Sequence, residues 1–403
     1  MRHDAAALLL ALTLVSSARA AECEGLPALD VKTAPGLCVG VVAADLGVPR
    51  SVVELQNGDL LVTDMGGWKE NAGRVLLLQR QGRRFVSRVL LTRLDRPHDI
   101  VIGPDGKAYV GVASGVMRFD PRAPKNTLTW IVGGDSGMPS LPSTGRHPLK
   151  ALVFDQRGDL YVNVGSASDN CDDQKRENET GAPTCAEAEG DDPRGSIRKY
   201  TMAWPAGQAT RHEIYARGLR NSMALAIHPV TGELFQAENA RDYIHRRIPG
   251  MTNDEDSPHE ELNGIERGRH YGWPYCYDDG VAAPEFPRAD CARHAKPLML
   301  LPAHAAPLGM TFYRGALITS APQRLHLVIA YHGYRAHGHR IVAIPFDDRG
   351  APSGPPVDLL SGWDATDKQP MGAPVDLIVA KDGGLYVAED RNGRVLRFGF
   401  KRR

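Results

Sequence analysis

Cysteine is scarce in this sequence. Only six of the 403 residues are cysteines, and none belongs to a Cys-x-x-Cys or Cys-x-x-Cys-His motif. Zinc sites favour the first spacing and attachment of a c-type haem needs the second, so neither group is expected. The cysteines instead lie in three local pairs, which predict three disulfides and an oxidising compartment. These pairs are Cys23/Cys38, Cys171/Cys185 and Cys276/Cys291.

Net charge and long apolar runs are also lacking. The 48 basic residues balance the 48 acidic residues. This balance does not indicate nucleic acid or an anionic membrane as a partner, whereas small neutral substrates suit such a surface. The apolar run at residues 5–15 is too short to span a bilayer, and no later run is long and apolar enough. The sequence therefore predicts no membrane span.

The N-terminal segment predicts export. A basic start, Met1-Arg-His, precedes the apolar run, and Ala18-Arg-Ala20 follows it with the small residues of a cleavage site. We therefore expect residues 1–20 to be a signal peptide. The mature chain, from residue 21, is expected to be periplasmic or secreted.

The chain does contain a repeat. Each copy is a short apolar strand, a turn with glycine and often aspartate, and a second apolar strand; the copies lie at residues 52–64, 100–112, 152–162, 225–235 and 377–387. Glycine takes the positive φ that tight hairpin turns require. The turn residues Gly58, Gly106 and Gly158 are spaced by about fifty residues, the length of a four-stranded propeller blade.

A degenerate sixth copy fits residues 310–331. The sequence thus predicts an all-β, six-bladed β-propeller over residues 21–403, in one domain. A pair of β-sandwiches is the alternative architecture. Polar insertions at about 167–195 and 240–294 are expected to be loops on the propeller face, each closed by one of the predicted disulfides.

Four segments place polar side chains in loops beside the predicted inner strands, where β-proteins often hold functional groups. Histidine is suited to exchanging a proton near neutral pH. Arginine and asparagine in loops can also be ordinary solvated residues, but four such segments in register favour a site. The candidates are His147 and Lys150, then Arg220 and Asn221, then Glu238, Asn239, Arg241 and Asp242 within residues 236–242, and finally His332 and Arg335.

The order of several motifs resembles a known family. Arg220-Asn221, residues 238–242, Tyr271-Gly-Trp-Pro-Tyr-Cys276 and Ala306-Pro-Leu-Gly309 follow the histidine loop in sequence. Together they resemble the soluble quinoprotein glucose/sorbosone dehydrogenases, most closely the sorbosone-dehydrogenase-like branch. The resemblance covers about residues 95–396, and the order and spacing of the motifs make it specific.

This resemblance implies bound pyrroloquinoline quinone (PQQ) and calcium, and oxidation of a sugar hydroxyl or hydrated aldehyde. It implies that His147 is the general base, and that Arg220 stabilises the oxyanion on the reduced quinone beside the cofactor contact Asn221. The backbone carbonyls of Ala240 and Arg241 correspond to calcium ligands. Lys150, His332 and Arg335 are assigned to the cofactor as well. Glucose-oxidising members have an arginine pair where this chain has residues 371–376, so Lys150, Arg335 or Arg314 is expected to recognise the cofactor carboxylates instead.

Three functions remain open from the sequence. The first is a periplasmic quinoprotein dehydrogenase that passes electrons to a separate acceptor, a cytochrome or a quinone. The second is a calcium-dependent, lactonase-like hydrolase with ligands drawn from Asp64, Asn163, Asn221 and Asp376. The third is a non-catalytic ligand-binding propeller that has lost PQQ. The motif context around Arg220 and residues 271–274 favours the dehydrogenase.

Overall fold

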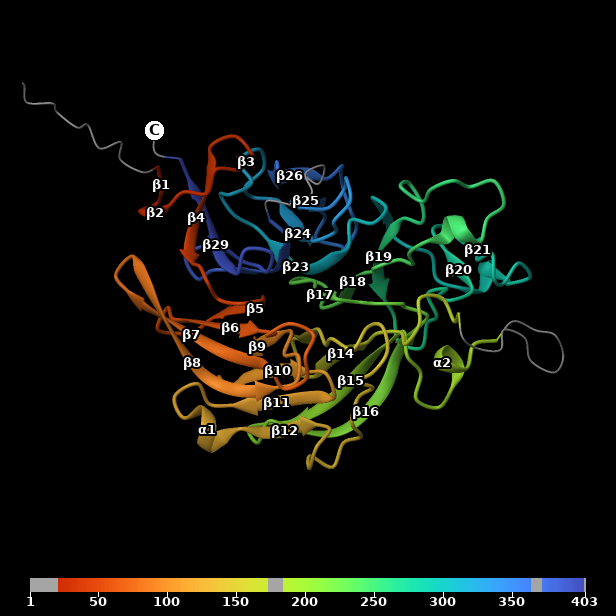
Figure 1. Cartoon of the computed structure of the whole chain (residues 1–403), viewed down its shortest axis with the longest axis horizontal. Helices are drawn as coiled ribbons and strands as arrows, with labels where there is room; N and C mark the ends of the chain where they lie inside the picture. Colours follow the sequence, from red (N-terminus) through yellow and green to blue (C-terminus); the bar gives the residue numbers. More distant parts are fainter. Residues whose placement is uncertain (1–20, 173–183, 364–371, 402–403) are drawn as a thin grey trace, which may run out of the picture.

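The computed structural model describes residues 21–172, 184–363 and 372–401. Six antiparallel sheets of four or five strands form in this part of the chain, and they follow one another around a ring (Figure 1). The predicted six-bladed propeller is confirmed, and a pair of sandwiches is excluded. Residues 1–20 lie outside the described ranges, so the signal peptide stays a prediction.

The blades take their strands in chain order, apart from two N-terminal strands. Blades 1 and 2 contain β5 (Pro49–Glu54), β6 (Leu60–Asp64), β7 (Gly73–Gln81), β8 (Arg84–Leu94), β9 (Ile100–Ile102), β10 (Ala108–Val112), β11 (Gly115–Phe119) and β12 (Thr129–Val132). Blades 3 and 4 contain β13 (Leu152–Phe154), β14 (Leu160–Val164), β15 (Ser196–Ala203), β16 (Gln208–Arg217), β17 (Ala224–Ile227), β18 (Leu234–Ala237), β19 (Glu260–Ile265) and β22 (Met299–Leu301). Blade 5 contains β23 (Pro307–Tyr313), β24 (Leu325–Tyr331), β25 (Arg340–Phe346), β26 (Val357–Ser361) and β3 (Lys32–Thr33). Blade 6 contains β27 (Pro374–Val379), β28 (Leu385–Glu389), β29 (Arg394–Phe400) and β4 (Leu37–Ala43).

The first and last parts of the described chain both contribute strands to blade 6. Strand β4, near the N-terminus, pairs antiparallel with β29, near the C-terminus, and Figure 1 shows the red strand beside the blue one. This pairing closes the ring. A disulfide between Cys23 and Cys38 joins β1 (Glu22–Cys23) to β4, and β1 pairs with β2 (Leu26–Pro27).

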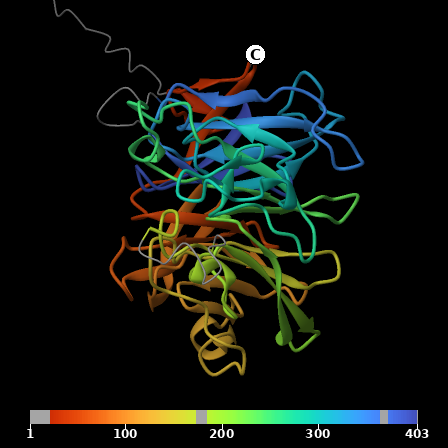
Figure 2. The same cartoon turned by 90° about the vertical axis from the view of Figure 1, so that its right-hand side faces the viewer.

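The second strand of each blade is buried along its whole length. Neighbouring blades cover both of its faces, so its sequence is nearly continuously apolar instead of alternating. Leu61 and Leu77 of blade 1 pack with Val110 and Phe119 of blade 2 in one such interface. The side view shows the blue blades at one end of the molecule and the gold and yellow-green blades at the other (Figure 2).

The predicted hairpin turns are confirmed. Gly58, Gly106 and Gly158 all have φ between +70° and +84°. At Gly158 a Cβ would lie 2.6 Å from Nε1 of Trp204, so this turn also needs glycine for space. The sixth, degenerate hairpin is β23 with β24.

The two long insertions pack against each other. They carry the remaining disulfides, Cys171–Cys185 and Cys276–Cys291, as predicted. Trp273 donates from Nε1 to the carbonyl of Asp169 at 3.1 Å, which joins the insertions. Their short elements are α2 (Ala186–Glu189), η1 (Ile244–Arg246), β20 (Cys276–Tyr277), β21 (Val281–Ala282) and η2 (Cys291–Arg293). Outside the insertions, helix α1 spans Pro124–Thr127. No helix in the described ranges is long and apolar enough to cross a membrane.

Candidate functional site

A cavity of about 460 Å³ lies where loops from five of the blades converge. Because these blades are spread around the ring, their loops can meet only near its axis. The volume falls within the range for one small-molecule ligand, about 300–1,000 Å³. We call it the axial cavity; its lining residues are Val48, Arg50, Met65, Gly67, Trp68, Arg146, His147, Pro148, Leu149, Asn221, Met223, Leu308, His332, Tyr334, Asp390 and Arg391.

Apolar side chains form one wall of the axial cavity. Met65, Leu149, Met223 and Leu308 belong to one buried cluster, which also includes Val375. The four lining residues come from four of the blades: Met65 follows β6, Leu149 and Met223 precede β13 and β17, and Leu308 is in β23. An apolar wall of this kind suits the face of a planar aromatic ligand.

His147 lies in the axial cavity, as the sequence predicts, with its ring held by Ser166. The Ser166 hydroxyl donates to the carbonyl of Ser168 at 2.7 Å. Its oxygen therefore accepts the proton of His147 Nδ1, at 2.8 Å, and this hydrogen-bond pattern assigns the tautomer. Nε2 is left with the lone pair, and it has no partner among the described residues.

Burial, together with the charges of Arg220 and Arg146, lowers the pKa of His147 well below its usual value. The imidazole is thus neutral near pH 7 and able to accept a proton at Nε2.

Asn221 also lines the axial cavity, beside His147. Its Oδ1 atom is buried and has no hydrogen-bond partner within the described part of the chain, although buried polar atoms are normally paired. Gly165 brings the two residues together: a Cβ there would lie 2.7 Å from the carbonyl oxygen of His147 and 3.1 Å from Asn221 Oδ1. The unsatisfied oxygen marks a position for a ligand donor or cation.

The third of the predicted residues to line the axial cavity is His332. Its Nε2 lies 3.1 Å from Asp390 Oδ1, and Arg50 forms a short ion pair with the same carboxylate. Burial acts to raise the pKa of Asp390, but His332 and Arg50 outweigh it and hold the pKa at about 2. Asp390 therefore stays ionised and fixes both partners.

Three guanidinium groups and one carboxylate line the axial cavity: Arg50, Arg146, Arg391 and Asp390. The surplus of positive charge suits an anionic ligand. Arg50 and Asp390 did not emerge from the sequence. Asp390 directly follows the second strand of blade 6, and His332 directly follows the second strand of blade 5. Comparing equivalent positions of the repeat would therefore have identified Asp390 from the sequence. No comparable sequence pattern points to Arg50.

Arg220 lies behind the axial cavity and does not line it. Its Nη1 donates to the carbonyls of Asn239 and Ala240, each at 2.8 Å. Nε donates to the carbonyl of Asp169 at 3.0 Å, and Nη2 pairs with the carboxylate of that residue. Arg220 is only 3% exposed, and its guanidinium ties three loops together.

Ala240 and Arg241 line a second, smaller space of about 30 Å³, the rear pocket, together with Arg220, Glu238 and Glu261. The Arg241 side chain pairs with Glu285 at 2.5 Å. Burial raises the pKa of Glu238 to about 7 and that of Glu261 well above its usual value. The two residues whose backbone carbonyls are predicted to bind calcium therefore lie near carboxyl groups but outside the axial cavity.

Lys150 and Arg335 do not reach the axial cavity either. The Lys150 ammonium is completely buried and donates to the carbonyls of Pro148 at 2.6 Å and Pro142 at 3.0 Å. Arg335 pairs with Asp254 at 2.8 Å. The carbonyls and the carboxylate satisfy these cations locally, so neither is placed to bind a cofactor carboxylate here. Arg314 pairs with Asp348 on the surface and is likewise absent from the lining.

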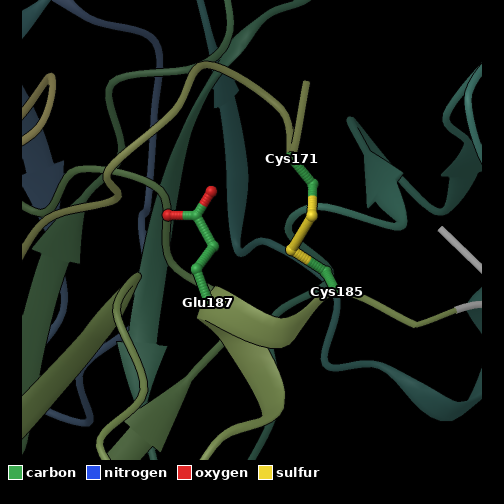
Figure 3. Close-up of side chains that lie close together, drawn as sticks. All are labelled: Cys171, Cys185 and Glu187. Carbon is green, nitrogen blue, oxygen red and sulfur yellow. A yellow bond between two sulfur atoms is a disulfide. The ribbon is translucent and has the colours of Figure 1, made fainter. Parts of the chain in front are cut away.

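One cluster elsewhere has metal-ligating residue types: Cys171, Cys185 and Glu187. Figure 3 shows the yellow bond between the two sulfur atoms. A disulfide offers no thiolate, and thiolate is the form of cysteine that binds metals. Glu187 accepts from the backbone amide of Ala167 at 2.6 Å. The cluster is a structural staple.

A sequence model of the TrAA12-like family matches residues 31–398. The PQQ-dependent sugar dehydrogenase of Hypocrea jecorina is 25% identical, over 88% of this chain and 86% of the relative. The PQQ-dependent pyranose dehydrogenase of Coprinopsis cinerea is 24% identical, over 92% of this chain. The chain spans only 54% of that protein's own length. An uncharacterized protein of Borreliella burgdorferi is 28% identical over 48% of this chain, and the match spans 50% of that protein.

Solved structures agree with the fold. The calcium structure of the Trichoderma reesei family AA12 enzyme superposes with a TM-score of 0.71 at 22% identity, over 95% of this chain and 100% of that one. The holo PQQ domain of the Coprinopsis cinerea pyranose dehydrogenase gives 0.69 at 21% identity, over 94% and 99%. The family match runs from just before β3 into β29 and so covers strands of all six blades. The chain therefore belongs to the TrAA12-like family.

Proposed function

We propose that this chain is a PQQ-dependent oxidoreductase that oxidises a sugar in the axial cavity, with His147 as the general base. The relatives in Hypocrea jecorina and Coprinopsis cinerea are named for PQQ-dependent oxidation of sugars. The observation that carries the proposal is a neutral imidazole with a free Nε2, in a cavity that three guanidinium groups also line.

The residues of the axial cavity fit PQQ, an anionic, planar quinone. Arg50, Arg146 and Arg391 supply positive charge for its carboxylates. The unsatisfied Oδ1 of Asn221 supplies a polar contact, and the apolar wall suits the ring face. Bound PQQ supplies an electrophilic carbon that accepts hydride.

The chain's own residues supply the proton chemistry. His147 Nε2 takes the proton of the substrate hydroxyl, because hydride leaves carbon more readily from an alkoxide. The bond from Nδ1 to Ser166 keeps the ring in the required tautomer. A low pKa keeps the base unprotonated but makes it weak, and negative charge bound nearby would raise that pKa.

Four of the five N–H donors of Arg220 are bonded within the described residues, one from Nε, two from Nη1 and one from Nη2. Arg220 could therefore face the cofactor only through the second N–H of Nη2. Arg50 and Arg391 line the axial cavity directly. The proposal therefore gives these two the larger share of charge stabilisation inside the axial cavity and leaves Arg220 to a direct test.

Calcium would be held at the rear pocket by the carbonyls of Ala240 and Arg241. Oxygen donors are the ligands that calcium prefers. The carbonyl of Ala240 already accepts from Arg220, but a carbonyl oxygen has two lone pairs and can serve both. The nearby carboxyls of Glu238 and Glu261, whose pKa values burial raises, would add charge once the cation displaces their protons.

The lactonase-like alternative gains no support. Of its four candidate ligands only Asn221 lines the axial cavity. Asp64 pairs with Arg74, Asn163 accepts from the amide of Ala151 at 2.5 Å, and Asp376 accepts from Ser51 at 2.6 Å.

The proposal includes export to the periplasm or the medium, which three disulfides support, and a separate electron acceptor, a cytochrome or a quinone. The test is to reconstitute the purified protein with PQQ and calcium and to screen sugars with a dye acceptor. PQQ-dependent dye reduction is expected. Failure to bind PQQ would favour the ligand-binding propeller instead.

A further inference from the structure

His332 is the second histidine that lines the axial cavity, and it is hydrogen-bonded to a carboxylate. It directly follows β24 of blade 5 and is 8% exposed. Its Nε2 lies 3.1 Å from Asp390 Oδ1 and 3.2 Å from Oδ2. Asp390, with a pKa of about 2, is ionised near pH 7 and can only accept hydrogen bonds. This pattern assigns the proton of the neutral ring to Nε2 and the lone pair to Nδ1.

The lone pair of His332 is accessible. Nδ1 has no hydrogen-bond partner among the described residues, yet it does not belong to the buried atoms that lack one. The accessible space beside His332 is the axial cavity. The ring of Tyr334 packs edge to face at 5.0 Å and, together with Asp390, holds the imidazole in place. A fixed proton acceptor is therefore available to a ligand in the axial cavity.

The groups behind His332 do not pass a proton inward. Arg50 pairs with the same carboxylate of Asp390, and its Nη2 lies 3.2 Å from His98 Nε2. A guanidinium has donors only, so it cannot accept a proton. Burial lowers the pKa of His98 well below its usual value and also lowers that of His339, so both rings are neutral near pH 7. Within the described residues, a proton taken up at Nδ1 of His332 therefore leaves again by the axial cavity.

The proposed reaction yields two protons, and His147 accounts for one of them. The sugar hydroxyl gives its proton to His147 Nε2, and the sugar carbon gives hydride to the cofactor. Cytochromes take electrons one at a time and leave the hydrogen behind. The hydrogen that arrives as hydride must therefore leave as a proton when two electrons have passed to the acceptor. A second base in the axial cavity would let the two protons leave independently.

We propose that His332 is this second base, and that its Nδ1 accepts the proton released when the reduced cofactor is reoxidised. The bond that holds this hydrogen to the cofactor breaks, and its electron pair stays on the cofactor. Two one-electron cytochromes, or one acceptor quinone, remove two electrons. His332 then gives the proton to water in the axial cavity. The inference rests on the proposed function and adds a catalytic residue to it.

The experiment measures the two half-reactions separately in holoenzyme reconstituted with PQQ and calcium. In His332→Gln, reduction by saturating sugar should stay within about twofold of wild type, whereas reoxidation by a saturating dye acceptor should slow by about ten- to a hundredfold. Added imidazole should restore reoxidation in His332→Ala, which a merely structural role would not allow. His326→Gln is the matched control, because His326 is 3% exposed in the same strand β24 but lies outside the axial cavity. Both of its half-reactions should be unchanged.

A second readout needs neither PQQ nor turnover. Nitrogen-15 NMR of the histidine rings at about pH 9, where histidine is normally neutral, identifies the protonated nitrogen. The signal of His332, assigned by its absence from His332→Gln, should show the proton at Nε2. A proton at Nδ1 would overturn the inference, since the lone pair would then point away from any ligand and toward Asp390.

The outcomes separate this inference from the proposed function. A wild type that binds no PQQ, or that sugar does not reduce, would refute the proposed function itself. Normal reduction together with unchanged reoxidation in His332→Gln would refute the second base alone. Equal slowing of both half-reactions, a raised KM for the dye alone, or weakened PQQ affinity with normal reoxidation of the loaded enzyme would also overturn it.

Discussion

His147 and Ser166 form a 2.8 Å hydrogen bond beyond the open end of the first hairpin of blade 3. His147 precedes β13, whereas Ser166 follows β14, so the hairpin itself brings them together. Gly165 leaves the space that this approach requires. The bond fixes which ring nitrogen can accept a proton.

Ser166→Ala should lower kcat by up to about a hundredfold, because a misoriented base loses rate without losing substrate affinity. The acidic limb of the kcat/KM profile should also move to lower pH, since the imidazolium loses its acceptor at Nδ1. Steady-state kinetics from about pH 5 to 8 checks both effects. Ser166→Thr keeps the hydroxyl and should stay close to wild type; equal losses in both variants would argue against an orienting role.

Lys150 makes stability depend on pH. Burial, followed by the charges of Arg198 and Arg194, lowers its pKa to about 7 from 10.5. Between those values the unfolded chain binds the proton and the folded protein does not, so the free energy of unfolding rises with pH, by up to about 1.4 kcal/mol per pH unit. Lys150→Met should remove that slope in denaturant titrations at about pH 7.5 and 9.5.

Lys199→Met is the control for this prediction. Lys199 lies in β15 of the same blade and pairs with Asp155 at 3.2 Å and Asp159 at 3.0 Å. Its pKa is raised, so its removal should leave the slope between about pH 7.5 and 9.5 intact. A slope unchanged in Lys150→Met would contradict the lowered pKa of Lys150.

Asp99 and Asp376 form a buried pair bridged by Ser51, whose Oγ lies 2.9 Å from one carboxyl and 2.6 Å from the other. Burial raises the pKa of both, and for Asp99 the charge of Asp376 adds to the effect. The folded protein therefore keeps a proton that the unfolded chain has lost, and the stability present at low pH declines as pH rises through the folded pKa.

Asp376→Asn should flatten this decline, because the amide cannot ionise. Thermal or denaturant unfolding at about pH 4.5 and 8 measures the difference. A decline of the same size in the variant would show that the pair does not share a buried proton.

Arg220→Lys should lower the melting temperature, because an ammonium cannot replace the planar set of donors that reaches Asp169, Asn239 and Ala240. If Arg220 also faces the quinone oxyanion, single-turnover quinone reduction should become slower at unchanged PQQ affinity. The expected loss of transition-state stabilisation is about 3–4 kcal/mol. A lower melting temperature with normal quinone reduction would leave Arg220 as a structural residue.

The repeat predicted the fold because each hairpin carries its own turn glycine, as at Gly58 and Gly158, and because the second strand of each blade is buried on both faces. The sequence near β4 did not predict that this strand closes the ring, because its partner strand lies almost the whole chain away, as the pairing of Leu37 with Phe400 shows. Local cysteine spacing was enough to predict the disulfides.

The site was predictable only where a loop motif adjoins the first or second strand of a blade. His147, Asn221 and His332 reach the axial cavity. Lys150 resembles them in sequence, but its ammonium turns back to the carbonyl of Pro148. Sequence position does not fix the direction of a side chain, and Arg50 acquires its role from Asp390 of a neighbouring blade, 340 residues away in the chain.

The central claim, that His147 is the base of a PQQ-dependent dehydrogenase, is tested most directly by single-turnover reduction of bound PQQ in His147→Gln. Saturating sugar is mixed with holoenzyme, and PQQ absorbance is followed against pH. We expect wild-type affinity for PQQ and reduction at least about a hundredfold slower, with the pH limb of the base abolished. Reduction at the wild-type rate, or an unchanged pH profile in the variant, would contradict the account.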